Sequence, residues 1–286
     1  MAEIISGKIV SEKLRSELRD EIAEFKNKNG ITPGLAVIMV GNNPASAVYV
    51  RNKHKACLDV GIESYQIEFP EDITEDQLLG KIDELNADDK VNGILVQLPL
   101  PDSINEERVI ERISPDKDVD AFHPSNVGRI MIGNYSFLPC TPAGIISLLD
   151  HYNVEISGKR CAVVGRSNIV GKPMALLLTE RNGTVTLCHS RTQNLDKILF
   201  ESDIIVVAIG KPDFLKADMV KPGAVVIDVG INRTFEGKLV GDVAFDEVSQ
   251  VASMITPVPG GVGPMTITTL LRNTLLAAKM QFLKRK

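Results

Sequence analysis

Apolar residues recur along the chain with two alternating periods. Residues 7–29 carry apolar side chains at helical spacing, and Gly30 ends that pattern. An unbroken apolar run at 35–40 predicts a buried strand, and residues 44–60 predict a second helix. Because strand and helix alternate in this way nearly throughout, the chain is expected to form parallel sheets covered by helices.

The later elements continue the alternation. Further strands are expected at 65–69, 93–96, 160–164, 184–188, 204–208 and 225–229. Further helices are expected at 75–85, at 103–113 with a capping box of Ser103 and Glu106, from Pro142 with Thr141 as its cap, and at 264–283, with a hairpin at 231–241.

Residues 114–139 interrupt this rhythm with several prolines and glycines, so we interpret them as a linker with an irregular segment. We place the domain boundary near Phe122. The predicted fold class is α/β with two domains and a cleft between them, each domain a mostly parallel sheet flanked by helices. Residues 1–121 with 262–286 form the first domain, and residues 122–261 form a Rossmann-like second domain.

Composition and charge exclude several classes of protein. The 286 residues have a net charge of −5 and 5% aromatic residues, which argues against a nucleic-acid partner. No apolar stretch approaches the roughly 18 residues of a membrane span, and the first residues lack the apolar core of a signal peptide. The four cysteines form no CxxC pair, so we expect no metal and reduced thiols in the cytoplasm.

A glycine-containing turn follows the expected strand 160–164. The turn runs from Gly165 through Arg166 and Ser167 to Gly171, and it resembles the dinucleotide fingerprint with its middle glycine replaced. Gly165 would let the chain reverse, and Gly171 would let the helix approach the sheet. A pyrophosphate could then lie on the first N–H groups of the helix. The alternative is an ordinary turn between strand and helix.

The end of the next strand indicates which dinucleotide binds. NAD-binding proteins usually have an acidic residue there for the ribose 2′-hydroxyl, but this strand is followed by His189, Ser190 and Arg191. Because a guanidinium can pair with a 2′-phosphate that a carboxylate would repel, we predict NADP as the cofactor. The alternative is that Arg191 is a solvated cation.

Three polar side chains are expected at the carboxyl edge of the first sheet. Tyr49 and Lys53 lie four residues apart, on one face of the expected helix 44–60. Gln97 ends the strand 93–96 and points toward the same edge. Each also has an ordinary interpretation, as a rim aromatic, a surface lysine and a strand cap.

Six segments together carry a more specific resemblance. They are Pro44-Ala45-Ser46 leading to Tyr49 and Lys53; residues 93–101; residues 117–120 with Phe122-His123-Pro124; residues 165–174; residues 226–232; and residues 257–266. They resemble the bifunctional methylenetetrahydrofolate dehydrogenase/cyclohydrolase family, from about Ile4 to the last helix.

The resemblance implies a role for each matching residue. Lys53 would be the catalytic amine, held by Gln97, with Tyr49 stacking near the folate and Asp120 anchoring the pterin. Gly261 and Pro264 would line the folate pocket. The cofactor would contact Gly165, Arg166, Ser167, Ser190, Arg191 and Ile231. A homodimer is also implied.

The implied chemistry has two steps. Hydride leaves 5,10-methylenetetrahydrofolate for NADP, and water then attacks the methenyl cation to give 10-formyltetrahydrofolate. The second step needs a neutral amine, so the pKa of Lys53 must fall below its usual value of about 10.4. Burial of Lys53 would lower it.

One residue departs from the family pattern. Ala121 follows Asp120 where the family usually has glycine. If that position requires a positive φ, alanine adds strain of about 1 kcal/mol.

Two other functions are compatible with the domain pattern. The first is an NADP dehydrogenase for a small hydroxy or keto acid, for which we find no cationic clamp. The second is a dinucleotide sensor with an inactive first domain, which the joint presence of Tyr49, Lys53, Gln97 and Asp120 argues against.

Overall fold

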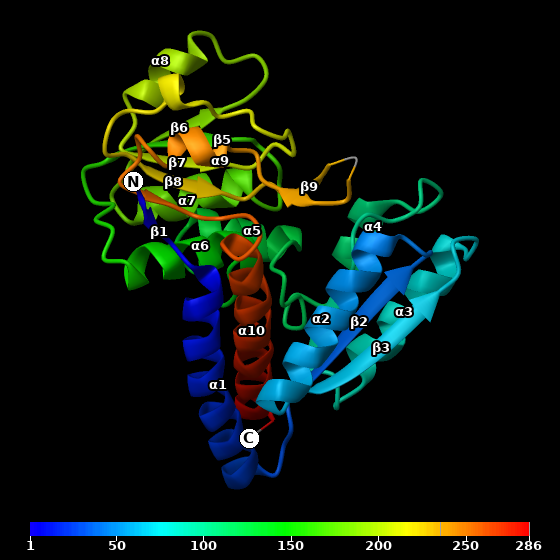
Figure 1. The fold of residues 1–286 in the computed structure, drawn as a ribbon. Coiled ribbons are helices and arrows are strands. Elements are labelled where there is room, and N and C mark those ends of the chain that lie inside the picture. Colours follow the sequence, from blue (N-terminus) through cyan, green and yellow to red (C-terminus); the bar gives the residue numbers. More distant parts are fainter. Residues whose placement is uncertain (235, 286) are drawn as a thin grey trace. The chain divides into compact units, whose positions relative to one another are not determined.

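The structure is a computed structural model that describes residues 1–234 and 236–285, except the side chain of Ala45 (Figure 1). The chain divides into two compact units. Unit 1 comprises Met1–Glu12 and Thr141–Thr266, and unit 2 comprises Lys13–Cys140 and Ile267–Lys286. Two long helices, α1 (Gly7–Asn29) and α10 (Val262–Lys284), contribute residues to both units.

Unit 1 contains a six-stranded sheet in the order β1-β11-β8-β7-β5-β6, and every neighbouring pair is parallel. The strands are β1 (Glu3–Ile4), β5 (Arg160–Val164), β6 (Thr184–Cys188), β7 (Ile204–Val207), β8 (Val225–Asp228) and β11 (Met254–Ile255). The chain passes from β5 to β6 on one side and then to β7 on the other side of β5. Ligands of open parallel sheets bind at such a switch in strand order.

Helices cover the sheet of unit 1 because its strands are apolar and need cover on both faces. Apolar side chains of β5, β7, β8, α8 and α9 meet in one core cluster. The remaining elements are α6 (Cys140–His151), α7 (Gly171–Glu180), α8 (Leu195–Phe200), the 3₁₀ helix η1 (Ala217–Met219), α9 (Phe245–Val248), and the hairpin strands β9 (Asn232–Arg233) and β10 (Leu239–Val240).

Unit 2 contains a three-stranded parallel sheet in the order β3-β2-β4. The central strand is buried over its whole length, because its alternate side chains enter two different cores. Leu35, Val37 and Met39 pack with α1, α2 and α10, and the intervening residues pack with α3 and α4. The elements are β2 (Gly34–Val40), α2 (Pro44–Val60), β3 (Glu63–Phe69), α3 (Glu75–Ala87), β4 (Gly93–Val96), α4 (Glu106–Arg112) and α5 (Pro124–Met131).

The predicted fold class is confirmed: two α/β units, each with a parallel sheet, one of them Rossmann-like. The division between the units differs from the predicted boundaries. Residues 122–140 belong to unit 2, because Phe137 and Cys140 pack in the same core as Val119. Residues Met1–Glu12 belong to unit 1, because β1 pairs with β11.

Some local predictions were wrong. Residues 124–131, interpreted as irregular, form α5 with Pro124 in its first turn. The side chain that caps α4 is Asn105, which accepts a hydrogen bond from Arg108 N, and not Ser103. Helix α6 begins at Cys140, two residues before the predicted start.

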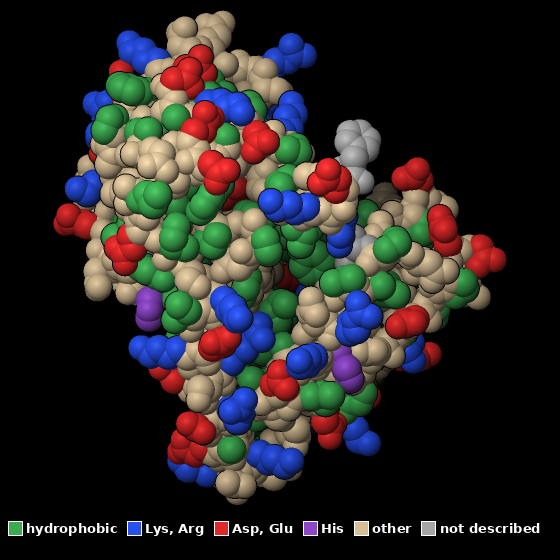
Figure 2. Space-filling view, in the orientation of Figure 1, with side chains coloured by type: hydrophobic (Ala, Val, Ile, Leu, Met, Phe, Trp, Pro, Cys, Tyr) green, Lys and Arg blue, Asp and Glu red, His purple; other side chains and the backbone are tan. Residues whose placement is uncertain are grey.

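In the part of the chain that the structure describes, no helix has the length and hydropathy to cross a membrane. Acidic and basic side chains are interspersed on the face in Figure 2.

Candidate active site

Lys53 lies on α2 and is buried in unit 2, with only 8% of its surface exposed. Its Nζ donates a hydrogen bond of 3.0 Å to Oε1 of Gln97, which directly follows β4. The Gln97 amide is oriented in turn, because its Nε2 donates to the Leu98 carbonyl at 2.7 Å. Tyr49 lies one helical turn before Lys53 on α2 and is half-buried. The structure therefore brings Lys53 and Gln97 together, as their positions in the sequence predict.

Burial lowers the pKa of Lys53, because the ammonium form loses hydration. The charges of Asp120, Cys140 and Cys57 act in the opposite direction but do not overcome the effect of burial. The direction of the shift is the one that the sequence analysis required. A lysine with a lowered pKa can supply a neutral amine near physiological pH.

Asp120 lies in a turn of unit 2, outside the helices and strands, and is half-buried. Ala121, which follows it, is fully buried and has a φ of 59°, in the left-handed region. The suspected departure from the family pattern is therefore a position that favours glycine. The cost of alanine there is of the order of 1 kcal/mol.

The neighbours of Asp120 have structural partners. Lys117 Nζ donates to the carbonyls of Leu85 and Asp88 at 2.9 and 2.8 Å. The buried Asp118 carboxylate accepts from Phe122 N, His123 N and Asn126 Nδ2, at 3.3, 2.8 and 2.8 Å respectively. These two residues of the sequence motif hold the turn, and Asp120 is the one whose charge acts on Lys53.

The glycine turn of unit 1 has the shape that the fingerprint predicts. Gly165 follows β5 with a φ of 119°, and a side chain there would place its Cβ 2.2 Å from the carbonyl oxygen of Ala208. Since Ala208 follows β7, this close approach lies at the switch in strand order. A Cβ on Gly171, the first residue of α7, would lie 2.0 Å from the Gly165 carbonyl oxygen. Both positions therefore require glycine.

The other predicted cofactor residues lie at the surface of unit 1. Ser167 Oγ accepts hydrogen bonds from the backbone N–H groups of Val170 and Gly171 at 3.2 and 3.3 Å, which orders the start of α7. Arg166, Ser190, Arg191 and Ile231 are exposed. Ser190 and Arg191 come directly after the carboxyl end of β6 and His189, as predicted.

Gly261 and Pro264 belong to unit 1 and not to the unit that carries Lys53. Gly261 lies against the beginning of α1, where a Cβ on Gly7 would lie 1.7 Å from the Gly261 carbonyl oxygen. Lys8 N also donates to the Gly260 carbonyl at 3.0 Å.

Asp228, the last residue of β8, holds the loops that follow the strand. It is 2% exposed, and its carboxylate accepts from the N–H groups of Gly230, Asp242 and Val243. Burial raises its pKa to about 6. Asp242, which the sequence analysis missed, accepts from three consecutive N–H groups that follow β7, at Ile209, Gly210 and Lys211. The two carboxylates fix loops at the ends of β7 and β8.

Two histidines lie close in sequence to predicted site residues, His54 directly after Lys53 and His123 three residues after Asp120. His123 caps α5 by accepting a hydrogen bond from Ser125 N at 3.0 Å. His54 is half-buried, and its Nδ1 has no hydrogen-bond partner among the described residues.

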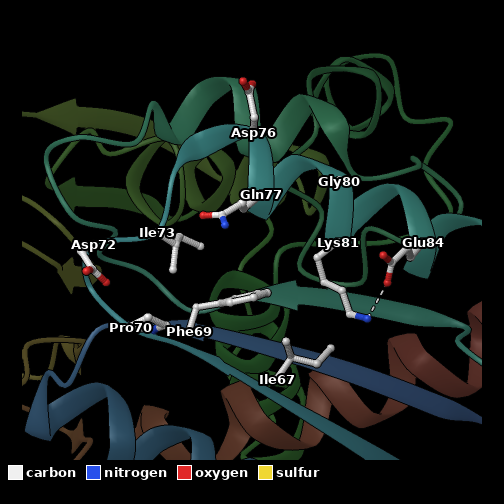
Figure 3. Close-up of a pocket in the computed structure, with 10 residues that line it drawn as sticks. All are labelled: Ile67, Phe69, Pro70, Asp72, Ile73, Asp76, Gln77, Gly80, Lys81 and Glu84. Carbon is white, nitrogen blue, oxygen red and sulfur yellow. Dashed lines mark hydrogen bonds and ion pairs between the residues drawn. The ribbon is translucent and has the colours of Figure 1, made fainter.

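A pocket of about 690 Å³ lies between β3 and α3 in unit 2 (Figure 3). Ile67 and Phe69 of β3 lie opposite Lys81 and Glu84 of α3, which form an ion pair of 2.6 Å. None of the described residues that line it is one of the predicted site residues.

The chain thus has one α/β unit with a parallel sheet of the dinucleotide-binding type and a second α/β unit that carries a buried lysine. Two family descriptions match the chain: "Tetrahydrofolate dehydrogenase/cyclohydrolase, catalytic domain" over residues 5–120, and the NAD(P)-binding domain of the same family over residues 139–282. The chain belongs to this tetrahydrofolate dehydrogenase/cyclohydrolase family.

Individual relatives agree with this assignment. The chain is 61% identical to the bifunctional protein FolD of Acetivibrio thermocellus, over 98% of each chain. Among solved structures, a FolD methylenetetrahydrofolate dehydrogenase/cyclohydrolase from Campylobacter jejuni is 50% identical with a TM-score of 0.96, covering 98% of this chain and 100% of that one. A Trypanosoma brucei FolD, solved with NADP and an inhibitor, is 39% identical with a TM-score of 0.95, covering 98% of each chain. The predicted dehydrogenase and cyclohydrolase activities and the NADP cofactor are confirmed.

Proposed function

We propose that Lys53 of unit 2 is the base of the hydrolysis, in an enzyme that first oxidises 5,10-methylenetetrahydrofolate with NADP. The observation that carries the proposal is a buried lysine with a lowered pKa, hydrogen-bonded to Gln97 at 3.0 Å. A neutral Lys53 still has N–H groups to donate to Gln97 Oε1. Its lone pair is then available to a water molecule.

The oxidation needs no base on the protein. Hydride leaves the methylene carbon for the nicotinamide of NADP, and the adjacent folate nitrogen stabilises the cation that forms. The protein contributes by holding the carbon and the nicotinamide at reaction distance. The products are NADPH and the methenyl cation.

The hydrolysis consumes that cation. Water attacks the methenyl carbon and Lys53 takes one of its two protons. The bond between this carbon and N5 then breaks, N5 takes the remaining proton of the former water, and the product is 10-formyltetrahydrofolate. Because the substrate is a cation, its presence near Lys53 disfavours the ammonium form further. The buried position of Lys53 and the charge of the substrate thus both favour the reactive neutral amine.

Asp120 and Tyr49 are the proposed folate contacts in unit 2, and Gly261 and Pro264 are those in unit 1. Asp120 is supported by its charge interaction with Lys53, which places a carboxylate within electrostatic reach of the base. A carboxylate can accept hydrogen bonds from the amino and ring N–H groups of a pterin. Tyr49 is supported by its place one helical turn before Lys53.

The turn 165–171 is the proposed pyrophosphate site. Its support is the pair of glycines that bring the backbone close to β7 and α7, and the N–H groups at the start of α7. The 2′-phosphate of NADP is assigned to Ser190 and Arg191, because neither residue carries the negative charge that would repel it. Arg166 and Ile231 complete the proposed contacts.

A homodimer and a cytoplasmic location also belong to the proposal. The dimer is supported by the family resemblance alone, and sedimentation velocity on the purified chain tests it. Four buried free cysteines support a reducing compartment.

An absorbance assay tests the function as a whole. The purified protein is mixed with methylenetetrahydrofolate and either NADP or NAD, and the formation of reduced cofactor and of methenyltetrahydrofolate is followed. The proposal predicts turnover with NADP at much lower cofactor concentration than with NAD. Absence of turnover with either cofactor would contradict it.

A further inference from the structure

Asn273 of α10 lies within the residues that the NAD(P)-binding description covers, but it belongs to unit 2. It is buried, with 7% of its surface exposed. Its Nδ2 donates to the Val119 carbonyl at 2.8 Å and to the Leu138 carbonyl at 3.0 Å. Helix α10 is therefore hydrogen-bonded, through Asn273, to the residue directly before Asp120.

The turn that carries Asp120 needs such support, because no helix or strand fixes it. After Asp120 in the sequence, the N–H groups of Phe122 and His123 donate to the Asp118 carboxylate. Directly before Asp120, the Val119 carbonyl accepts from Asn273 Nδ2 and also from Cys140 Sγ, the latter at 3.4 Å. Asp120 is thus held between two buried side chains.

We propose that Asn273 is a positioning residue for the hydrolysis, which fixes Asp120 relative to Lys53 by holding the Val119 and Leu138 carbonyls. This inference rests on the roles proposed above for Lys53 and Asp120. Asn273 itself is assigned no contact with substrate. Loss of its amide frees the turn, so Asp120 no longer holds the folate in place relative to Lys53.

The chain provides a matched control on the same helix. Gln281 of α10 also uses a side-chain amide to donate to two backbone carbonyls, those of Asn92 and Asp116, at 2.9 and 3.0 Å. Asp116 lies in the same loop as Asp120 but four residues earlier. Gln281→Leu therefore removes an attachment of α10 to this loop without touching the residues beside Asp120.

The experiment compares Asn273→Leu, Gln281→Leu and Asp120→Asn with the unchanged protein. For each variant we would measure kcat and KM of both reactions, the pH profile of methenyltetrahydrofolate hydrolysis, NADP affinity and thermal stability. The charged or ionisable groups that act on Lys53 are Asp120, Cys140 and Cys57. A displaced Asp120 stabilises the ammonium of Lys53 less, so the acid limb of the profile must move to lower pH.

The proposal predicts that Asn273→Leu raises the KM for folate about 10-fold or more and shifts the acid limb to lower pH. NADP affinity stays unchanged, and Gln281→Leu loses stability but keeps its kinetics and pH profile. If Asn273→Leu does not fold, Asn273→Ser, which keeps a hydroxyl donor, is measured instead.

Three results would overturn the inference. The first is equal kinetics in Asn273→Leu and Gln281→Leu while Asp120→Asn is impaired. The second is an unshifted pH profile in the Asn273 variant. The third is failure of both Asn273 variants to fold, which would make the residue structural. If Asp120→Asn itself has unchanged kinetics, the proposed role of Asp120 is the part that fails.

Discussion

Lys53 and Gln97 come from different elements of unit 2, and the lysine donates a 3.0 Å hydrogen bond to the amide oxygen of the glutamine. A neutral acceptor at this place differs from a carboxylate in one important respect. It orients the amine without adding a negative charge, so it does not stabilise the ammonium form strongly. The pKa of Lys53 can then stay below its usual value, as burial dictates.

Gln97→Glu should therefore impair hydrolysis at neutral pH. An opposite charge in direct contact raises the pKa of a buried lysine by about 1–3 units. Hydrolysis at pH 7 should therefore fall, by up to about tenfold for each unit that the pKa rises. Activity should recover at higher pH, as a pH–rate profile would reveal. Gln250→Glu, which adds the same charge to an exposed position in unit 1, is the control. A profile that stays in place would count against the account.

The backbone conformation at Ala121 predicts which substitutions this position tolerates. With a φ of 59° and full burial, this position accepts glycine readily and a β-branched residue poorly. Ala121→Gly relieves about 1 kcal/mol of strain, but loses about 0.8 kcal/mol from one buried methyl group and some backbone entropy. Its stability should stay within about 1 kcal/mol of the unchanged protein. Ala121→Val should lose about 2 kcal/mol or more, from strain and overpacking. Urea unfolding measures both, and equal stability of the valine variant would refute the assignment of strain.

Arg191→Ala should weaken the preference for NADP. If the guanidinium pairs with the 2′-phosphate, the KM for NADP should rise about 10- to 100-fold, because a charge-assisted hydrogen bond contributes about 1.5–3 kcal/mol. The KM for NAD, which lacks that phosphate, should hardly change. Lys197→Ala, which removes an exposed cation from α8, should affect neither. An unchanged ratio between the two cofactors in Arg191→Ala would remove Arg191 from the site.

Asp228 should make the stability of the protein depend on pH between about 4 and 6. Its folded pKa of about 6 lies above the ordinary value of 3.8, so the folded state binds the proton more tightly than the unfolded state. The stability that this proton contributes is fully present below pH 3.8 and is lost as the pH rises through 6. As the pH rises over this range, the unfolding free energy of the unchanged protein should therefore decrease relative to that of Asp228→Asn. Denaturant titrations at several pH values test the slope, and a difference that stays constant would contradict a buried, protonating carboxyl.

Much of this fold follows from local patterns that act over a few residues. The apolar run at 35–40 predicts a buried strand, and the structure confirms it and extends it by Gly34. The turn from Gly165 to Gly171 could be predicted because a Cβ at either glycine would collide with backbone. The spacing of Tyr49 and Lys53 fixed their common helical face.

Other features depend on partners far away in the sequence. Strands β1 and β11 have two residues each, too few for a period to be visible, and they form because they complete the edge of a sheet. The boundary at Cys140 depends on the packing of Phe137 and Cys140 with Val119, which no local pattern reveals. Asn273 is separated from Val119 by 154 residues, so its role could not be inferred from spacing.

The most direct test is single-turnover and steady-state hydrolysis of methenyltetrahydrofolate by Lys53→Met, with Lys55→Met on the exposed side of α2 as the control. Because general-base catalysis contributes about 10²–10⁴-fold, hydrolysis by Lys53→Met should fall by at least about 100-fold. NADP affinity should stay within about twofold, and Lys55→Met should behave like the unchanged protein. Full hydrolytic turnover by Lys53→Met would contradict the assignment of the base.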